Sequence, residues 1–545
     1  MCGRSAAREV QLLGRRHEVP DPAWSHGCRR GGHDRRPVGN SPHPSARGSV
    51  GRPRRGARPG RRLRRHIMDT RRRLTEAFDT VSAWADAHRE PAPEPAGERA
   101  AGRFEAHLAA LAEHLRGGRP LPYSAYAGHP VRPPHPAAVA GRLAVSLVGP
   151  EDRVFDGDPS TVALEEEVIA DLAAMLGLPG AHGHLTSGGA VANLEALWAA
   201  REAHPDLGIA HGADMYFAHA HMCAVLRTPA YPVPTDAAGR MDPDALAREL
   251  RRERVGTVVV SAGTATLGAV DPIADILPLC RERGVRVHAD AAYGGFFTLL
   301  VDADELRATP AARHLRALAE CDSVVVDPHR IGLYPSGCGA VLFREPVDGA
   351  GGWRDPLAGD FSSDVPRPGE LGLDRARPGT LAAALWLTLR ALPLTPEGVG
   401  SGLAASLRGT RQWCELIEAE AELMLFQQPE LDILTYLALT GEQHPRMSRV
   451  EASSRHILRA GTADAEHLAH PSHLSTLSVR VLDFLRRHPR AVADRNRTLV
   501  LRSALLDSAA ESRVDDLHAR ITALAAAAPR RASGPDEAEP VAALP

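Results

Sequence analysis

The sequence predicts an α/β protein whose main feature is a mostly parallel β-sheet with helices on both faces. Between about residues 183 and 345, short apolar segments such as VGTVVVSAG, VRVHADAAY and DSVVVDPH alternate with helical patterns. Strands that are separated by helical crossovers pair in parallel, and their helices then cover both faces of the sheet. After about residue 400, helices are mixed with the strand-like segments LSTLSVRVLDF and TLVLRSALLDS, which predicts a smaller α+β domain.

The predicted helices follow from the spacing of apolar residues. Residues 70–88 and 101–116 repeat apolar side chains three and four positions apart, and a Pro/Glu connector separates them. STVALEEEVIADLAAMLGL begins with hydroxyl caps and acidic residues and ends at Gly177, as an amphipathic helix does. Further helices are predicted at 190–203, 242–253, 272–283, 305–319 and 381–392, with the strands GHLTS, MYFAHA and GAVLFRE among them.

Composition divides the chain into five segments. Residues 1–67 hold 17 arginines and four carboxylates, whereas the rest carries a net charge of −15. The arginine-rich segment is expected to be disordered, because it has too little apolar surface to offset the entropy of ordering. We interpret it as sequence upstream of a start at Met68; an arm that binds nucleic acid is the less favoured alternative, since aromatic residues are not interleaved. The other predicted segments are an N-terminal helical arm (68–150), a large domain (151–400), a small domain (401–530) and a disordered tail (531–545).

Hydropathy and cysteine usage argue against several protein classes. No uncharged apolar segment is long enough to span a membrane, and none follows the N-terminal charges as in a signal peptide, so a cytoplasmic protein is expected. The seven cysteines are odd in number and include no CxxC pair, which argues against a disulfide framework and a zinc site. We expect them to be small buried residues, and no metal site is predicted.

Three predicted strand ends carry the residues that indicate chemistry. In LTSGGAVANLEAL (185–197), two glycines turn the chain into a helix whose free N–H groups can bind an anion, although a tight loop is the simpler alternative. In VRVHADAAYGG (285–295), Asp290 ends a buried strand and needs a charged partner such as a protonated ring nitrogen, unless it caps the next turn. In DSVVVDPHRIGLYPSGCGAVLFRE (322–345), a strand ends in Asp-Pro-His-Arg before a glycine-rich turn.

In this order and spacing, the motifs resemble those of the group II amino acid decarboxylases that depend on pyridoxal 5′-phosphate (PLP). This family includes aromatic amino acid, glutamate, tyrosine and aspartate decarboxylases. Its pattern is a Thr-Ser-Gly-Gly turn, a His beside aromatic residues, a Gly-Thr-Thr strand end, an Asp-Ala-Ala strand and an Asp-x-His-Lys motif. The resemblance covers roughly residues 123–508, and the interval from Asp290 to Arg330 is 40 residues. It implies PLP as cofactor, the fold of type I PLP-dependent transferases, and a homodimer in which the arm 68–150 wraps around the partner.

The resemblance assigns the first cofactor contacts to the N-terminal half of the large domain. Backbone N–H groups of Gly188, Gly189 and Ala190 would hold the cofactor phosphate. His221, in AHAHMCAVLRT, would stack on the pyridine ring and count among the catalytic residues. Thr264, in SAGTATLGAVD, would lie near the phenolic oxygen of PLP.

The remaining roles fall on the two later strand ends. Asp290 would pair with the pyridinium nitrogen, and Ala292 would pack against the ring. Asp327 and His329 would contact the cofactor, with His329 also beside the reacting centre as a catalytic residue. Arg330 stands where the family has the catalytic lysine that carries PLP covalently.

Several positions depart from the family pattern. Ala190 replaces a hydroxyl residue at the phosphate, Ala265 replaces the second Thr, and Ala376 replaces the Ser that usually precedes Arg377. In the family, a Tyr on a loop after the lysine protonates the substrate carbon. Residues 346–370 here contain no Tyr, so the general acid is unassigned.

The chain contains no lysine, because all 65 Lys+Arg residues are arginine. A guanidinium keeps its proton up to a pKa of about 12 and is a poor nucleophile, so no side-chain amine can carry PLP. We favour an amino acid decarboxylase (a carboxy-lyase) that binds an amino acid substrate and works without that link, with His329 or water as proton donor. The alternatives are a catalytically degenerate subunit that binds PLP, a metabolite or an active paralogue, and an arginine-tailed nucleic-acid binder. The identity of the amino acid substrate is not predicted.

Overall fold

The computed structural model describes residues 71–83, 98–116, 132–148, 151–153, 159–345, 372–373, 376–439, 441, 444–463, 474–505 and 511–528. All of these belong to the unit that runs from Pro59 to Pro545. The predictions for the N-terminal extension 1–67, the loop 346–370 and the tail 531–545 fall outside the described residues.

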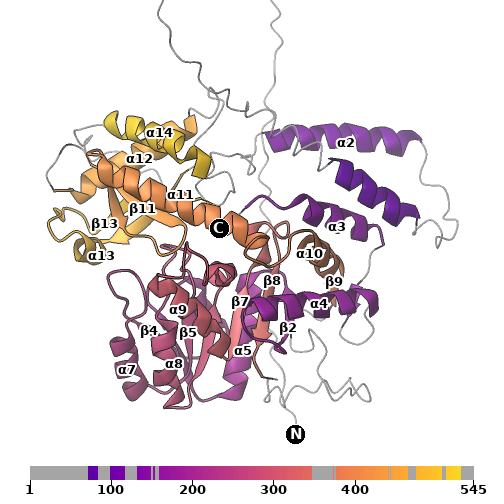
Figure 1. Cartoon of the computed structure of the whole chain (residues 1–545), viewed down its shortest axis with the longest axis horizontal. Helices are drawn as coiled ribbons and strands as arrows, with labels where there is room; N and C mark the ends of the chain where they lie inside the picture. The colour runs from indigo at the N-terminus through magenta and orange to yellow at the C-terminus, as the bar shows by residue number, and fades with distance from the viewer. Residues whose placement is uncertain are drawn as a thin grey trace, which may run out of the picture. The chain divides into compact units, whose positions relative to one another are not determined.

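Seven strands form the large sheet, in the order β2-β8-β7-β6-β5-β3-β4 (Figure 1). The five strands β3 to β7 are parallel: β3 (Gly208–Gly212), β4 (Ala230–Val233), β5 (Val255–Ser261), β6 (Arg286–Asp290) and β7 (Ser323–Val326). At one edge, β8 (Gly339–Phe343) pairs antiparallel with both β7 and β2 (His182–Thr186). The predicted mostly parallel sheet is therefore confirmed.

Alternate residues of the central strands face two different layers of helices. In β7, Val324 and Val326 join the core that contains residues of α4 (Pro159–Met175), α7 (Pro243–Arg252) and α8 (Ile273–Arg281). Val325, between them, packs with Ala192 and Ala196 of α5 (Gly189–Ala203). Because successive strand residues point to opposite faces, this division shows that helices cover the sheet on both sides.

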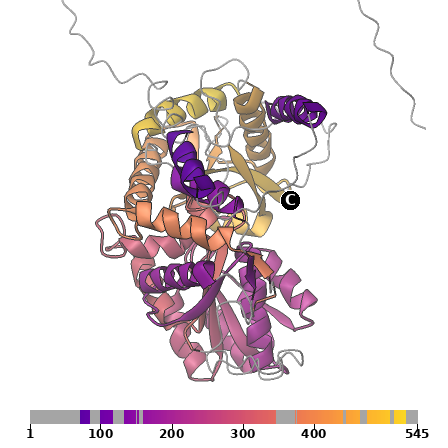
Figure 2. The ribbon, with the colours of Figure 1, turned by 90° about the vertical axis from the view of Figure 1, so that its right-hand side faces the viewer.

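A second sheet is antiparallel and lies in the C-terminal region. Its order is β10-β11-β13-β12, formed by Leu423–Gln427, Ile433–Ala438, Arg497–Ala504 and Ser475–Arg480. The helices α10 (Thr380–Ala391) and α11 (Val399–Ala419) precede it, and α14 (Val514–Ala526) follows it. Two helices lie between its strands in the chain: α12 (Met447–Ala463) between β11 and β12, and α13 (Val481–Arg487) between β12 and β13. In Figures 1 and 2 these orange-to-yellow elements from α11 onward lie together on one side of the large sheet. Trp413 and Tyr436 pack there with their rings tilted and 5.5 Å apart, within a second hydrophobic core.

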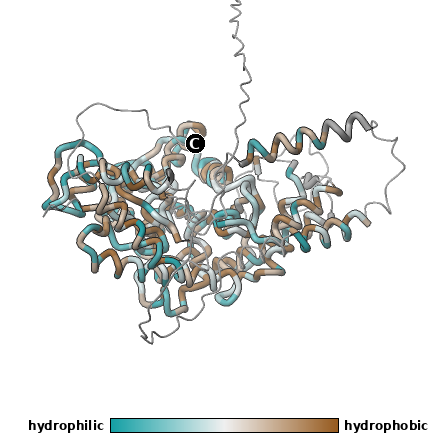
Figure 3. The backbone as a smooth tube through the Cα atoms, turned by 90° about the horizontal axis from the view of Figure 1, so that it is seen from above, coloured by the Kyte–Doolittle hydropathy of each residue, from teal (hydrophilic) through white to brown (hydrophobic). Residues whose placement is uncertain are grey.

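The N-terminal helices differ in how far they are covered. α3 (Pro136–Ser146) packs closely on α10, since a Cβ on Gly141 would lie 3.0 Å from Cα of Ala384. On α2 (Glu98–Arg116) an apolar stripe is exposed instead: Phe104, Leu108, Leu111 and Leu115. Figure 3 shows brown alternating with teal along this helix. Within the described ranges, no helix is long and apolar enough to cross a membrane.

Three element predictions are wrong. The predicted strand MYFAHA leads instead into α6 (Ala218–Val225), while the strand of that region is β3, whose GIAHG lacks an apolar run. Glycine is required in β3 because a Cβ on Gly208 would lie 2.8 Å from the carbonyl oxygen of Pro229. The helix predicted at 305–319 is shortened to α9 (Pro310–Arg316) and a 3-10 turn, because Pro310 occupies a first-turn position. The segment VLDF, predicted as strand, begins α13.

The five described cysteines, Cys223, Cys280, Cys321, Cys338 and Cys414, are buried free thiols. This confirms the interpretation of them as small core residues. Cys2 and Cys28 lie outside the described residues.

Candidate active site

The carboxyl ends of three neighbouring parallel strands meet at one edge of the large sheet. Ser261 at the end of β5 is aligned with Asp290 at the end of β6, and Asp290 is aligned with Val325 of β7. Thr264 and Asp327 follow β5 and β7 directly. In sheets of this type, ligands bind outside the carboxyl ends of the strands. The structure thus brings the predicted residues of three strand ends to one edge.

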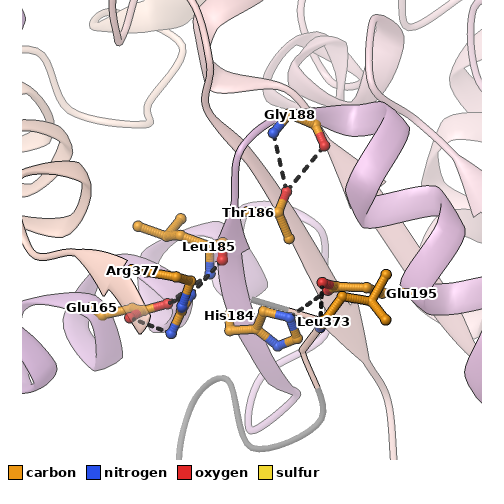
Figure 4. Close-up of polar contacts among 8 residues, drawn as sticks. All are labelled: Glu165, His184, Leu185, Thr186, Gly188, Glu195, Leu373 and Arg377. Carbon is orange, nitrogen blue, oxygen red and sulfur yellow. Dashed lines mark hydrogen bonds and ion pairs between the residues drawn. The ribbon is translucent and has the colours of Figure 1, made fainter. Parts of the chain in front are cut away.

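The turn between β2 and α5, residues Thr186–Gly189, requires glycine. Gly188 has a φ of 145°, a backbone conformation that side chains rarely adopt. A Cβ on Gly189 would lie 2.7 Å from Oδ2 of Asp327, and a Cβ on Gly339 would lie 2.8 Å from the amide nitrogen of Gly189. The Thr186 hydroxyl donates to the carbonyl of Gly188 (3.1 Å; Figure 4). The amide of Gly188 donates to Oγ1 of Thr186 (3.4 Å), and that of Gly189 interacts with Asp327. Since α5 begins without a side-chain cap, the remaining N–H groups of its first turn can bind an anion.

A buried ion pair and a buried His–Glu hydrogen bond hold β2 below the glycine turn (Figure 4). Glu165 of α4 accepts from the amide of Leu185 (2.7 Å) and from the Arg377 guanidinium (2.6 Å), which also donates to the Leu185 carbonyl. Nε2 of His184 lies 2.6 Å from Glu195 of α5, and Glu195 also accepts from the amide of Leu373 (2.9 Å). Both pairs are less than one-tenth exposed, so they position the strand that leads into the turn.

Asp327 is a buried carboxyl group in contact with the glycine turn. Burial raises its pKa to about 7, while Arg330 and the amide of Gly189 lower it and nearby Asp290 raises it. Oδ1 is buried and has no hydrogen-bond partner among the residues that the structure describes. Near neutral pH this group can therefore hold a proton and donate it in a hydrogen bond to an anion.

His329 lies beside the same turn. Its Cε1 is 4.0 Å from the position that a Cβ on Gly188 would take. Nδ1 lies 2.6 Å from the carbonyl oxygen of Cys338, which can only accept, so Nδ1 carries the hydrogen. Burial lowers the pKa of His329, with a further lowering from Arg330, so the ring is neutral and Nε2 offers a lone pair. This is the arrangement of a general base.

Arg330 follows His329 on the 3-10 turn Pro328–Ile331. Its Nε lies 3.5 Å from Oδ2 of Asp327, and its side chain is 35% exposed. A second guanidinium, that of Arg502 on β13, is close enough that the charge on Arg330 adds to the lowering of the Arg502 pKa, which burial dominates. Two positive charges therefore lie at this edge of the sheet.

Asp290 has a partner that the sequence did not predict. Nε2 of His219 on α6 lies 3.3 Å from Oδ2 of Asp290, and the His219 side chain is fully buried. His221, the residue predicted to stack on a ring, is exposed two positions further along α6. Residues two apart on a helix point in nearly opposite directions, so the two histidines cannot both face Asp290. Apart from the repeated AHAH spacing, no signal in the sequence could have distinguished them.

The other predicted contacts lie close to the same edge. Thr264 is buried and closes a turn by accepting from the amides of Leu267 (3.4 Å) and Ala269 (3.1 Å). Ala292 is partly buried beside α5 and β8 residues of the core, and Ala190 is exposed at the start of α5.

Arg502 is a functional candidate that sequence reasoning missed. It donates to the carbonyls of Ala265 (2.6 Å) and Thr266 (3.0 Å), so a residue of the small sheet holds the turn that carries Thr264. A single arginine within the apolar segment TLVLRSALL was the available signal, because a buried guanidinium needs partners.

Some predicted parts of the site cannot be placed. The loop 346–370 and the side chain of Ala376 lie outside the described residues. In the part of the chain that is described, no group of three or more His, Cys, Asp or Glu residues could hold a metal ion.

Comparisons with known proteins relate this site to PLP chemistry. Residues 151–350 match the model of the pyridoxal-dependent decarboxylase conserved domain. L-2,4-diaminobutyrate decarboxylase of Rhizobium meliloti is 36% identical over 262 residues, which are 44% of this chain and 50% of that protein. A probable L-tyrosine/L-aspartate decarboxylase of Methanothermobacter thermautotrophicus is 35% identical over 204 residues, 35% of this chain and 53% of that protein. The chain thus spans about half the length of the curated relatives it matches.

Solved structures share the fold over a larger part of the chain. Mouse CSAD superposes with a TM-score of 0.66 at 18% identity and covers 86% of this chain and 99% of its own. The glutamate decarboxylase domain of a Vibrio parahaemolyticus protein gives a TM-score of 0.62 at 16% identity, with 87% and 97% coverage. At these identities the likeness establishes the fold, and the predicted type I architecture is confirmed.

Proposed function

Because this chain belongs to the PLP-dependent group II decarboxylase family, we propose that it is an amino acid decarboxylase that holds PLP without a covalent link to a lysine. The observation that carries the proposal is the glycine turn at the start of α5, against which Asp327 and His329 are placed. Asp290 lies at the neighbouring strand end. An anion site, a neutral histidine and a buried carboxylate together fit a phosphorylated aromatic aldehyde with a basic ring nitrogen.

The residues of this chain divide the binding of PLP among them. Backbone N–H groups of the glycine turn would hold the phosphate, and protonated Asp327 would donate to it. Asp290 would accept a hydrogen bond from the ring nitrogen. When bound, PLP supplies the electron sink that makes loss of CO2 from an amino acid possible. Nε2 of His329, with its free lone pair, would move a proton at the reacting centre.

Arg330 decides how the cofactor is retained. A guanidinium cannot supply the amine that ties PLP to a chain, and no lysine exists elsewhere in this sequence. Retention therefore depends on hydrogen bonds and charge alone, and slow loading and easy loss of the cofactor are expected. The positive charges of Arg330 and Arg502 favour a substrate that carries a carboxylate.

The binding mode is tested by absorbance. PLP added to the purified protein should show free-aldehyde absorbance that dialysis removes, and treatment with borohydride should fix no cofactor to the chain. A cofactor band that survives dialysis and becomes covalent on reduction would contradict the proposal.

Turnover is tested with the same PLP-loaded protein. Individual amino acids are added, including diaminobutyrate, tyrosine and aspartate, the substrates named for the relatives. Release of equal amounts of CO2 and amine is expected for one of them. If PLP binds but no amine forms from any amino acid, the chain is instead a degenerate subunit of the same fold.

We also propose a homodimer. The apolar stripe of α2 (Phe104, Leu108, Leu111 and Leu115) supports it, because side chains of this size at successive helical turns are normally covered. Size-exclusion chromatography with light scattering should give twice the chain mass. Replacing Leu108 and Leu111 by Glu should shift the protein towards monomer, whereas Glu substitution of the exposed Leu482 on α13 should not.

We further propose that the protein is cytoplasmic. The five described cysteines are all free, which is typical of proteins in reducing compartments.

A further inference from the structure

His219 and Asp290 form a buried pair that joins α6 to the end of β6. Nε2 of the ring lies 3.3 Å from Oδ2 of the carboxylate. The His219 side chain is 0% exposed and that of Asp290 is 11% exposed. Only the Asp290 side of the pair is thus partly accessible to solvent.

The surroundings of the His219 ring determine where its hydrogens lie. Nδ1 lies 3.0 Å from the carbonyl oxygen of Tyr216, which can only accept, so Nδ1 carries a hydrogen. Nε2 is buried and has no hydrogen-bond partner among the residues that the structure describes, although Oδ2 of Asp290 lies 3.3 Å away. A lone pair on Nε2 would face a carboxylate oxygen in a buried environment, which is unfavourable. The oxygen atoms described near the two ring nitrogens, the Tyr216 carbonyl and Oδ2 of Asp290, can therefore both serve as acceptors.

Two further histidines lie near this pair, and neither competes for the charge. His288 on β6 lies between Ser323 Oγ (2.8 Å) and Asn193 Oδ1 (2.9 Å), which are neutral groups. Burial lowers its pKa to about 3, and neighbouring His219 lowers it further. Burial also lowers the pKa of His211 on β3. Of the three buried histidines, only His219 has a carboxylate partner.

Each oxygen of the Asp290 carboxylate has a polar neighbour. Oδ1 accepts from the amide of Ala292 (3.2 Å), and Oδ2 faces His219. A carboxylate has about four acceptor positions, so positions remain for one more donor. The Ala292 hydrogen bond and the His219 contact therefore flank the carboxylate before any ligand arrives.

We propose that His219 is a positioning residue that donates from Nε2 to Asp290 and holds this carboxylate towards the ring nitrogen of PLP. The part that concerns PLP rests on the proposed function. The part that concerns the proton can be observed in the protein without cofactor.

The proton is located by nitrogen NMR of full-length protein labelled with ¹⁵N-histidine. Signals of a ring with hydrogens on both nitrogens are expected for His219, and they should be missing from the His219→Gln variant. If the signals that disappear belong instead to a ring protonated at Nδ1 alone, the proposal is wrong.

The effect on Asp290 is measured by comparing the binding of PLP with that of its 1-deaza analogue, in which a carbon replaces the ring nitrogen. The wild-type protein should prefer PLP by about tenfold or more, as expected for one hydrogen bond to a charged group. His219→Ala should lose this preference, and His219→Gln should restore part of it, because its amide nitrogen can still donate. If His219 had a purely structural role, His219→Ala would weaken the binding of PLP and of the 1-deaza analogue equally. The ratio of the two affinities would then stay unchanged, which would overturn the proposal.

His314→Gln is the matched control, because His314 is also buried but lies on α9. Its preference for PLP should equal that of the wild type. If wild-type protein binds neither compound, the proposed function fails together with the cofactor-orienting role. The nitrogen spectrum then still decides whether His219 donates to Asp290.

Discussion

Nε of Arg330 lies 3.5 Å from Oδ2 of Asp327, three residues earlier on the same turn. The arginine thus keeps a positive charge beside a buried carboxyl group, while it removes the amine that would tie the cofactor to the chain. Charge and nucleophilicity are usually supplied together by lysine at such a position. Here they are separated, and each can be tested by itself.

Arg330→Lys should restore the covalent link. A lysine amine on this turn can both replace the charge next to Asp327 and react with the PLP aldehyde. Borohydride should then fix the cofactor to the chain, and retention of PLP after dialysis should rise at least about tenfold, a difference of about 1.4 kcal/mol. Absorbance and mass spectrometry of the reduced protein measure both effects.

Arg330→Met is the control for the charge, because it has similar length but offers neither charge nor amine. It should bind PLP more weakly than wild type and show no fixation. Equal behaviour of the Lys and Met variants would show that position 330 does not face the cofactor.

Arg502→Ala should perturb the candidate site through the turn that carries Thr264. Arg502 is 7% exposed and donates to the carbonyls of Ala265 and Thr266. Its loss removes two hydrogen bonds from a partly exposed turn together with the packing of a buried side chain, which costs about 1–3 kcal/mol in the free energy of unfolding. The turn with Thr264 should loosen, and PLP affinity should fall.

Arg497→Ala is matched to it, since Arg497 is on the same strand but is exposed and bonds only Ser478. Urea unfolding of this variant should stay within about 0.5 kcal/mol of wild type. A similar loss in both variants would remove the argument for a specific role of Arg502.

The large sheet could be predicted because its central strands are continuous apolar segments. VGTVVVSAG and DSVVVDPH became β5 and β7, since strands covered on both faces need no polar alternation. β3 and β4 were missed because GIAHG and AYPV carry Gly and Pro, which normally weaken a strand. Close backbone approach at Gly208 is a tertiary effect that local patterns do not contain.

The candidate site likewise contains some contacts that the sequence predicts and others that it does not. The meeting of Asp290 with Asp327 follows from parallel strand order, which can be inferred from the sequence. The pairing of His219 with Asp290 depends on which of two histidines α6 turns inwards, and Arg502 reaches Ala265 across 237 positions of sequence. Neither contact has a local signature, so both had to come from the three-dimensional structure.

Asp432→Asn should make the protein less sensitive to pH. Burial raises the pKa of Asp432 to about 6, although Tyr293 donates to its Oδ1 and Arg132 and Arg502 are near. An unfolded Asp has a pKa of about 3.9, so the folded state keeps a proton that the unfolded state has lost. This contribution to stability is complete below about pH 3.9 and is lost as the pH rises through 6.

Asn cannot ionise and keeps an oxygen that accepts from Tyr293. The stability of the variant relative to wild type should therefore increase by about 2 kcal/mol between pH 4 and pH 7, as measured by urea unfolding. Asp304→Asn, at a highly exposed position, should show no such trend. If the free energy of unfolding of Asp432→Asn changes with pH in parallel with that of wild type, the raised pKa of Asp432 is contradicted.

Gly189→Ala tests the glycine turn directly. Alanine favours a helix by about 1 kcal/mol over glycine, but its Cβ would lie 2.7 Å from Oδ2 of Asp327, and overpacking of this kind costs about 1–3 kcal/mol. Net stability should thus change little, whereas the displaced Asp327 should lower PLP affinity by about tenfold or more. Gly284→Ala provides the comparison, because its φ of 63° is strained for alanine but nothing lies within 4 Å of the added Cβ. Gly284→Ala should lose stability and keep its PLP affinity. If Gly189→Ala binds PLP as well as Gly284→Ala does, or if Gly284→Ala is the variant that loses affinity, the turn does not hold the phosphate.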